Sequence, residues 1–111
     1  MAELQQIIMQ YGPLPIETTA TIETDGPTIV SVSGSVWTST QKSMIGVALF
    51  IDGTPQIKAP IFSNGSNTHR TVVPVSIPYT FTIGQHTFLL QELTPLTTSD
   101  ANDFFVLTVQ Y

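Results

Sequence analysis

The sequence predicts an all-β protein with a jelly-roll-type antiparallel β-sandwich of about eight to nine strands. Three observations favour this class. Apolar residues alternate with polar ones, glycine and proline recur too often for long helices, and Asp-Gly and Asn-Gly pairs mark tight turns. The chain has 111 residues, which suits one hydrophobic core, and it has no cysteine, so the fold cannot depend on disulfides.

Residues 1–15 are expected to form an N-terminal arm or edge strand, and residues 16–111 a single β-sandwich domain. Leu4 to Tyr11 is a strand or an arm that Gly12-Pro13 ends. A short helix over residues 2–10 is the alternative, because this stretch begins with good helix formers.

The first half of the sandwich has four predicted strands. Ile16 to Thr24 is the first, and Val30 to Trp37 follows, in which valine alternates with serine as in a half-buried strand. Met44 to Ile51 is apolar on both faces, which is typical of a central strand or of one that meets another chain. Asp52-Gly53 then predicts a tight turn into a returning strand over Pro55 to Ser63.

The second half begins after a turn at Asn64 to Asn67. From Val73 to Ile83 every second residue is apolar, but Pro74 and Pro78 cannot donate to a strand ladder. This segment is therefore expected at a sheet edge or broken in two. A turn at Gly84 leads to a strand over His86 to Thr94.

The chain ends in a polar loop, Thr97 to Asp103, and a last strand, Phe104 to Tyr111. That strand begins with four consecutive apolar residues, so both of its faces call for burial. A thin sandwich buries only one face of a strand, which favours a second copy of the chain over the alternative that the N-terminal segment folds back as a cover. The expected oligomer interface consists of Met44, Ala48, Phe50, Phe104, Phe105, Leu107, Val109 and Tyr111.

Charge is sparse and negative. Three lysine and arginine residues stand against eight acids, and the net charge is -5. Nucleic-acid binding is not expected, because few cations are available to neutralise phosphates, and the same holds for anionic membranes. No apolar run approaches the roughly 20 residues that span a bilayer, and the N-terminus lacks the features of a signal peptide. A soluble chain is expected, in the cytoplasm or in a virus or phage particle.

Asn64, Asn67, His69 and Arg70 are the candidate ligand-binding residues. Amide, imidazole and guanidinium groups suit hydrogen bonds to sugar hydroxyls, and Tyr79 or Trp37 would supply a stacking face. The alternative is an ordinary solvent-facing hairpin turn.

Asp100, Asn102 and Asp103 are the candidate metal ligands, because three oxygen-bearing side chains within four residues suit Ca²⁺. The alternative is an Asx turn in which these side chains cap backbone N–H groups. No organic cofactor is expected. No cysteine nucleophile, G-x-S-x-G, phosphate loop or H-E-x-x-H motif is present, so no catalytic residues are assigned and the chain is not expected to be an enzyme.

Several segments in this order resemble a known family: SGSVW, the Asp-Gly turn, IFSN with the nearby His69-Arg70, GQHTFLLQ, and DANDFF before the last strand. Residues 25–111 resemble the trimeric jelly rolls of the tumour-necrosis-factor and complement type, as in phage fibre tips and uncharacterised bacterial proteins. The resemblance implies a homotrimer with the C-terminal strand near the threefold axis.

The sequence therefore favours a non-enzymatic, homo-oligomeric module with a structural or surface-recognition role. The oligomer would present several copies of one weak site, which raises avidity for a glycan or cell-surface ligand. A carbohydrate-binding lectin is the alternative, and an enzyme with an unrecognised site is a more remote one.

Overall fold

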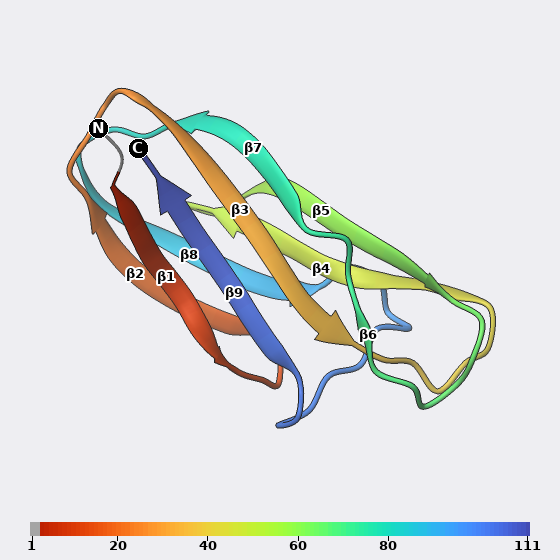
Figure 1. Ribbon diagram of the computed structural model, residues 1–111. Helices are drawn as coiled ribbons and strands as arrows, with labels where there is room; N and C mark the ends of the chain where they lie inside the picture. Colours follow the sequence, from red (N-terminus) through yellow and green to blue (C-terminus); the bar gives the residue numbers. More distant parts are fainter. Residues whose placement is uncertain (1–2) are drawn as a thin grey trace.

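The computed structural model describes residues 3–111. Figure 1 shows this part of the chain as strands joined by turns and loops. The nine strands are β1 (Leu4–Tyr11), β2 (Ile16–Ile22), β3 (Pro27–Val36), β4 (Ser43–Ile51), β5 (Thr54–Ser63), β6 (Arg70–Thr71), β7 (Val75–Thr80), β8 (Gly84–Glu92) and β9 (Phe104–Gln110).

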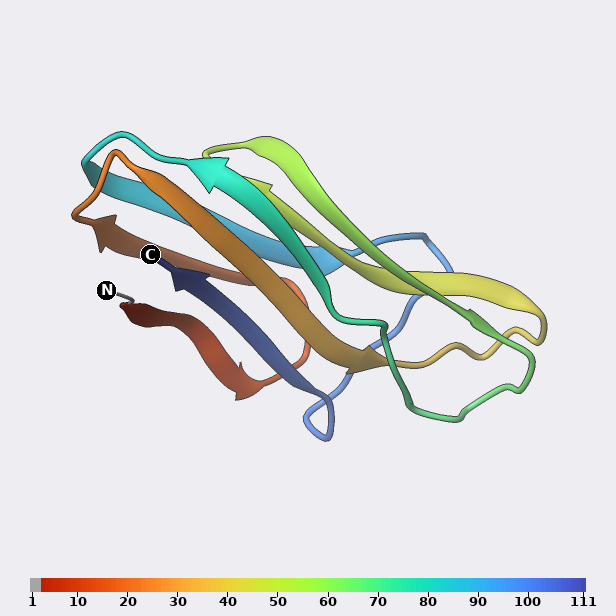
Figure 2. The same cartoon turned by 45° about the horizontal axis from the view of Figure 1, so that its top comes forward.

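The strands form two antiparallel sheets that lie one over the other (Figure 2). One sheet has the order β1-β9-β3-β6, with β7 also paired to β3, and the other has the order β2-β8-β4-β5. Neighbours in each sheet are mostly distant in sequence, because the chain crosses repeatedly between the two layers. The all-β, jelly-roll-type prediction of eight to nine strands is confirmed.

Alternation along the strands explains the core. In β3, the side chains of Val30, Val32 and Val36 are buried between the sheets, whereas the serines between them are partly exposed. At the end of β4, Asp52 and Gly53 have φ angles of 51° and 83°. These values fit the tight hairpin turn that their sequence predicts, and β5 returns beside β4.

The proline-containing alternating segment forms a short edge strand, as its sequence predicts. β7 pairs only with β3, and β6 is a separate two-residue strand on the same neighbour. Val73 and Ile83, at the two ends of the alternating set, lie outside these strands and are exposed, whereas Phe81 is buried.

The N-terminal segment forms an edge strand, β1, from Leu4 onward, so the alternative of a helix over residues 2–10 is wrong there. Residues 1 and 2 lie outside the described residues. β1 pairs with β9, with a bulge between Gln6 and Ile8. Ile8 and the buried Leu14 join the same core as the rest of the sandwich. Within residues 3–111 no helix is long and apolar enough to cross a membrane.

The core corrects the expected oligomer interface. Ala48, Phe105, Leu107 and Val109 are buried within the single chain, so they have almost no surface to offer a second copy. In β9 the alternation of side chains directs Phe105, Leu107 and Val109 toward the other sheet. Of the remaining expected interface residues, Met44 and Phe104 are exposed, and Phe50 and Tyr111 are half-buried.

Candidate functional site

Four strands bring distant residues together at one end of the five-stranded sheet. Tyr11, the last residue of β1, lies opposite Phe104, the first residue of β9. Gly34 of β3 lies opposite Phe105, so the next residue of β3, Ser35, lies near the start of β9. On the far side of β3, Ser35 pairs with Thr71 of β6, two residues after His69. The order of the strands therefore places the segment before β6 near the start of β9.

Asp103, the residue before β9, is the fully buried centre of this region. Its Oδ1 accepts a hydrogen bond from Ser35 Oγ at 2.7 Å and lies 2.6 Å from His69 Nδ1. Its Oδ2 accepts one from the backbone N–H of Asp100 at 2.9 Å. Its backbone carbonyl accepts the N–H of Gly12 at 2.7 Å. A buried carboxylate with this many donors is firmly oriented.

His69 stands between this buried carboxylate and solvent. Its side chain is 39% exposed, its Nε2 lies 3.7 Å from Asp100 Oδ2, and its ring centroid lies 5.8 Å from that of Trp37. The hydrogen bond to Asp103 raises the pKa of His69 above its ordinary value, and the negative charges of Asp103 and Asp100 add to this against a smaller opposing effect of burial. His69 therefore carries a positive charge over a wider pH range than a free histidine does.

The expected calcium trio adopts the Asx-turn geometry that was its alternative. Asp100 Oδ1 accepts the backbone N–H of Asn102 at 2.8 Å, and the carbonyl of Asp100 accepts the N–H of Asp103 at 3.1 Å. The carboxylate of Asp103 points into the protein and is taken up by N–H and O–H donors. In the described chain, the side chains close enough together to hold a metal ion are instead His69, Asp100 and Asp103, whose possible ligand atoms lie within 4.8 Å of one another.

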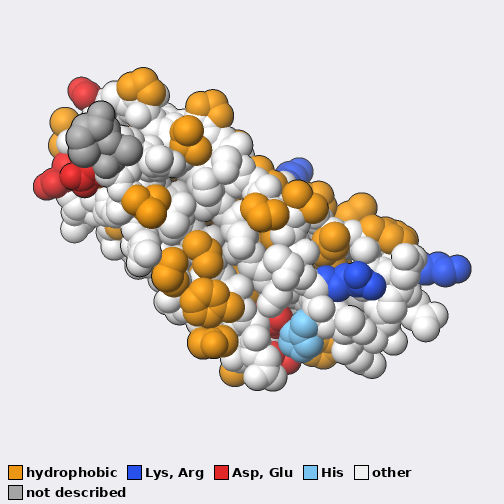
Figure 3. Space-filling model, in the orientation of Figure 1, with side chains coloured by type: hydrophobic (Ala, Val, Ile, Leu, Met, Phe, Trp, Pro, Cys, Tyr) orange, Lys and Arg blue, Asp and Glu red, His pale blue; other side chains and the backbone are white. Residues whose placement is uncertain are grey.

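An exposed aromatic pair lies at the start of β9, where Phe104 directly follows Asp103, the partner of His69. Tyr11 is 63% exposed and Phe104 is 37% exposed, and their rings meet edge to face with centroids 4.9 Å apart. Met9, also exposed, continues the apolar surface opposite Val106. On this face of the molecule, Figure 3 shows hydrophobic side chains gathered next to a histidine flanked by acidic side chains. We call Tyr11, Phe104, His69 and Asp100 the β9-start face.

Among the described residues, the other predicted ligand-binding residues form no hydrogen bond with His69. Asn64 and Asn67 are exposed in the turn after β5, and Asn67 has a φ of 59°, a left-handed conformation that asparagine tolerates. Arg70 is half-buried on β6 opposite Val36. Across residues 3–111 no hydrogen bond joins His69 to Asn64, Asn67 or Arg70; its side-chain partners are the two aspartates.

His86, the second histidine, has a structural role. His86 Nδ1 lies 2.6 Å from Asp52 Oδ2, and its Nε2 lies 2.6 Å from the carbonyl oxygen of Thr82. Asp52 Oδ1 also accepts the N–H of Thr87 at 2.9 Å. Burial opposes the charge of His86, but the bonds to Asp52 and Thr82 outweigh it and raise the pKa. This pair fastens the β4–β5 turn to β8.

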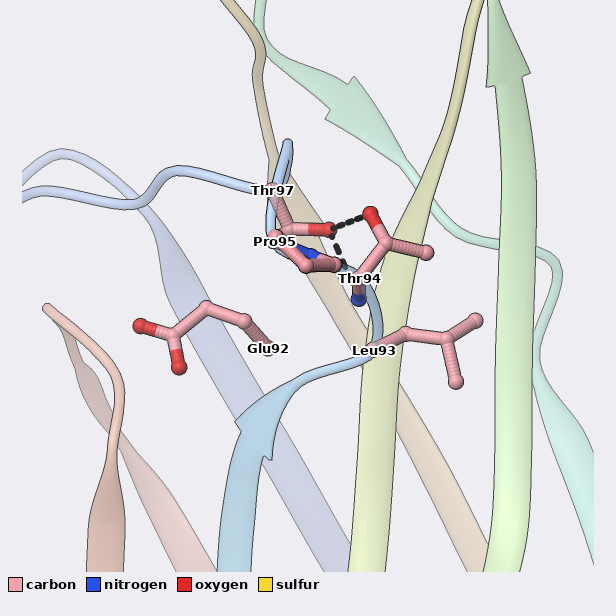
Figure 4. A pocket seen from close by; sticks show the side chains of 5 residues that line it. All are labelled: Glu92, Leu93, Thr94, Pro95 and Thr97. Atoms are coloured by element: carbon pink, nitrogen blue, oxygen red, sulfur yellow. Dashed lines mark hydrogen bonds between the residues drawn. The ribbon is translucent and has the colours of Figure 1, made fainter.

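Two shallow hollows lie elsewhere. One, of about 360 Å³, is lined by Glu92, Leu93, Thr94, Pro95 and Thr97. Figure 4 shows the hydroxyls of Thr94 and Thr97 bonded to each other, with Glu92 and Leu93 pointing to opposite sides of the chain. The threonine hydroxyls are thus engaged within the protein. The other, of about 340 Å³, is lined by Pro27, Thr28, Ile29, Pro78, Gln110 and Tyr111.

Sequence reasoning found only part of the β9-start face. His69, Asp100 and Phe104 were each singled out, but for three different roles, and Tyr11 was not. The available signal for Tyr11 was its position at the end of an edge strand, where an aromatic side chain has no core to enter.

No model of a known protein family matches the chain, and no curated protein sequence matches it either. Solved structures do resemble it. Dimeric latent PorU from Porphyromonas gingivalis has a TM-score of 0.60 at 10% identity over 97% of this chain, which spans only 12% of that protein.

Two smaller proteins align over most of their own length. The C-terminal domain of EclA, described as a sugar-binding protein, has a TM-score of 0.51 at 20% identity, with 98% of this chain and 76% of that one covered. CBM35, a family 35 carbohydrate-binding module, from Cellvibrio japonicus Abf62 has a TM-score of 0.51 at 12% identity, with 98% and 92% covered. At these identities the likeness concerns the fold, which is a jelly-roll β-sandwich.

Proposed function

We propose that the protein is a non-catalytic carbohydrate-binding module and that the β9-start face is its binding site. The observation that carries the proposal is that the exposed Tyr11–Phe104 pair lies at the start of β9, directly after the aspartate loop that contacts His69 and contains Asp100. A sugar ring has an apolar face of C–H groups and an edge of hydroxyls, so it needs both kinds of surface next to each other.

The chemistry of each residue fits this division. The aromatic rings offer apolar area to the C–H face of a pyranose. His69 donates to hydroxyl oxygens when protonated, and the Asp100 carboxylate accepts from hydroxyl groups. Tyr11 and Phe104 stand on paired strands, and His69 is oriented by the buried Asp103, so the site is largely pre-formed.

A binding role suits the region better than catalysis does. In a serine triad the hydroxyl bonds to the histidine Nε2. Ser35 Oγ instead donates to Asp103 Oδ1, the atom that also faces His69 Nδ1, so no activated nucleophile is assembled. Two similar folds, the EclA domain and the Abf62 module, are described by name as sugar-binding and carbohydrate-binding. These names support the proposal without identifying the sugar.

A glycan array followed by calorimetry on the best ligand tests the proposal. Tyr11→Ala and His69→Gln should each weaken binding at least about tenfold, which corresponds to about 1.4 kcal/mol. Ile83→Ala is the control, because Ile83 is 63% exposed in the loop between β7 and β8, and this variant should bind as the unmodified protein does. A ligand whose affinity is unchanged in Tyr11→Ala and His69→Gln would place binding elsewhere on the molecule.

Self-association remains the second candidate function. Met44 and Phe62 are cross-strand partners, and each is 48% exposed on the outer face of the four-stranded sheet. This apolar pair favours a homo-oligomeric role, for which a trimer was expected from sequence. Sedimentation velocity over a range of concentrations tests it, with Met44→Ser/Phe62→Ser as the variant expected to remain monomeric. A monomer at every concentration would exclude self-association.

A further inference from the structure

His69 and Asp100 each hold one ligand atom ready for a shared partner. His69 Nδ1 is hydrogen-bonded to Asp103 Oδ1 at 2.6 Å, so Nε2 is the ring nitrogen that is left for a ligand. The backbone N–H of Asn102 donates to Asp100 Oδ1 at 2.8 Å, so Oδ2 is the carboxylate oxygen that is left for a ligand. These two outward atoms face each other at 3.7 Å, and both side chains are about two-fifths exposed.

The separation matches the reach of a small divalent cation. Zinc binds imidazole nitrogen and carboxylate oxygen at about 2.0–2.2 Å, so an ion slightly off the line between the two atoms touches both. The approach is open to solvent, and water can fill the remaining coordination positions.

The buried carboxylate behind the histidine is a second feature of metal sites. Histidines that bind metals commonly donate the other ring N–H to a carboxylate, which fixes the tautomer and makes the free nitrogen a better ligand. Asp103 has this position and is itself held by Ser35 Oγ and the N–H of Asp100. The cluster thus contains two ligand atoms and the group that orients one of them.

We propose that His69 Nε2 and Asp100 Oδ2 form a solvent-facing binding site for a late first-row divalent cation, with Asp103 as the positioning residue. An imidazole ligand selects zinc, copper or nickel over calcium, which takes six to eight oxygen ligands. The site differs from the Ca²⁺ trio expected from sequence because its principal ligand is a nitrogen. It uses neither Tyr11 nor Phe104, so it does not rest on glycan binding.

Protons compete with the metal for Nε2. The charged groups in contact with His69 are Asp103 and Asp100. Metal affinity should therefore fall at low pH, because the cation must displace a proton from the imidazole. Binding at Nε2 would leave the hydrogen bond between Nδ1 and Asp103 in place.

Calorimetry with ZnCl₂ and untagged, metal-free protein tests the site at pH 7.5. One zinc per chain is expected, and His69→Gln and Asp100→Asn should each abolish this binding. Asp25→Asn removes an exposed acid elsewhere and serves as the control that retains it. Tyr11→Ala should also retain it, so failure of glycan binding leaves this result intact. Absence of one-to-one binding, or its survival in His69→Gln, would overturn the proposal.

Histidine ¹⁵N NMR gives a readout independent of affinity. Zinc should shift the Nε2 resonance of His69, leave Nδ1 protonated, and leave both nitrogens of His86 unchanged. A shift at Nδ1 of His69, or at His86, would contradict the assignment. Asp103→Asn should weaken zinc binding about 10–100-fold. If that variant does not fold, Ser35→Ala is the substitute, because it removes a hydrogen bond that holds the same carboxylate, and it should also weaken zinc binding. Unchanged zinc affinity in these variants would exclude the positioning role of Asp103.

Discussion

The phenyl ring of Phe105 lies over Gly34, its cross-strand partner, and fills the space that a side chain at position 34 would need. A Cβ on Gly34 would come within 2.5 Å of the ring carbon Cδ1 of Phe105 and within 3.0 Å of Cε1. The ring is fully buried, so it cannot turn aside without disturbing the core. Phe105 directly follows Phe104, a residue of the β9-start face.

Gly34→Ala should therefore destabilise the protein. The added methyl group overpacks a closed region, which costs about 1–3 kcal/mol. Chemical denaturation measures the change. Gly65→Ala is the control, because a Cβ there would meet no atom closer than 3.7 Å and the backbone is not left-handed. Equal stability of the two variants would show that the Phe105 ring is free to move.

Phe104 and Phe105 should respond in opposite ways to truncation. Phe105→Ala removes a fully buried ring and should cost about 3–5 kcal/mol of stability. Phe104→Ala removes a partly exposed ring and should change stability little, but it should weaken glycan binding. Denaturation and calorimetry on both variants make the comparison. A Phe104→Ala protein that binds normally would argue against the aromatic surface as the sugar platform.

Asp103→Asn should lower both stability and the pKa of His69. The amide cannot accept all the donors that the carboxylate serves, and loss of a charge-assisted bond costs about 1.5–3 kcal/mol. NMR titration of His69 follows the second effect. The pKa should fall toward 6.5, because its largest cause is the bond to Asp103. An unchanged titration would mean that Asp103 does not govern this histidine.

The His86–Asp52 pair should make stability depend on pH in a defined window. The raised pKa of His86 means that its contribution is complete below about pH 6.5, its ordinary value, and is lost as the pH rises through the folded-state pKa. The pKa of Asp52 is lowered by its bonds to His86 and Thr87, despite burial that acts in the opposite direction. Its contribution is present above 3.8 and is lost as the pH falls through the folded-state value.

His86→Gln should thus cost most between about pH 4 and 6.5, and less at pH 9. A loss of about 1–2 kcal/mol is expected in that window, since Asp52 is partly exposed and its interaction is screened. Denaturation of both proteins across this pH range measures the difference. A cost that does not vary with pH would show that the pair contributes through packing alone.

Local patterns predicted the strands well because each depends on nearby residues. Alternation of valine and serine defined β3, and Asp52-Gly53 defined the β4–β5 turn. Pro74 and Pro78 correctly indicated an edge position for β7. These signals need no knowledge of which strands become neighbours.

The expected interface was only partly right for the same reason. Consecutive apolar residues at Phe104 and Phe105 do not distinguish a strand exposed on one face from a strand buried on both. Ala48 is buried even though it faces away from the core, since it lies in register between Lys58 and Gln91, whose longer side chains flank it. Neighbouring strands, rather than a second chain, account for its burial.

The candidate site depended on long-range topology. His69 and Asp103 are separated by 34 residues, and they meet only because β6 and β9 both pair with β3. Residue types alone identified each as polar and suitable for a ligand. Their pairing follows from the order of the strands, which composition and spacing do not encode.

The position of β9 between β1 and β3 has a consequence for biosynthesis. β1 leaves the ribosome well before its partner, which lies more than ninety residues downstream, since Tyr11 pairs with Phe104. Until Phe104 to Gln110 have been translated and released from the exit tunnel, β1 carries an unpaired edge and the larger sheet lacks its middle. Folding of this sheet is therefore expected to be completed only after β9 has been synthesised, and nascent chains would need protection from association until then.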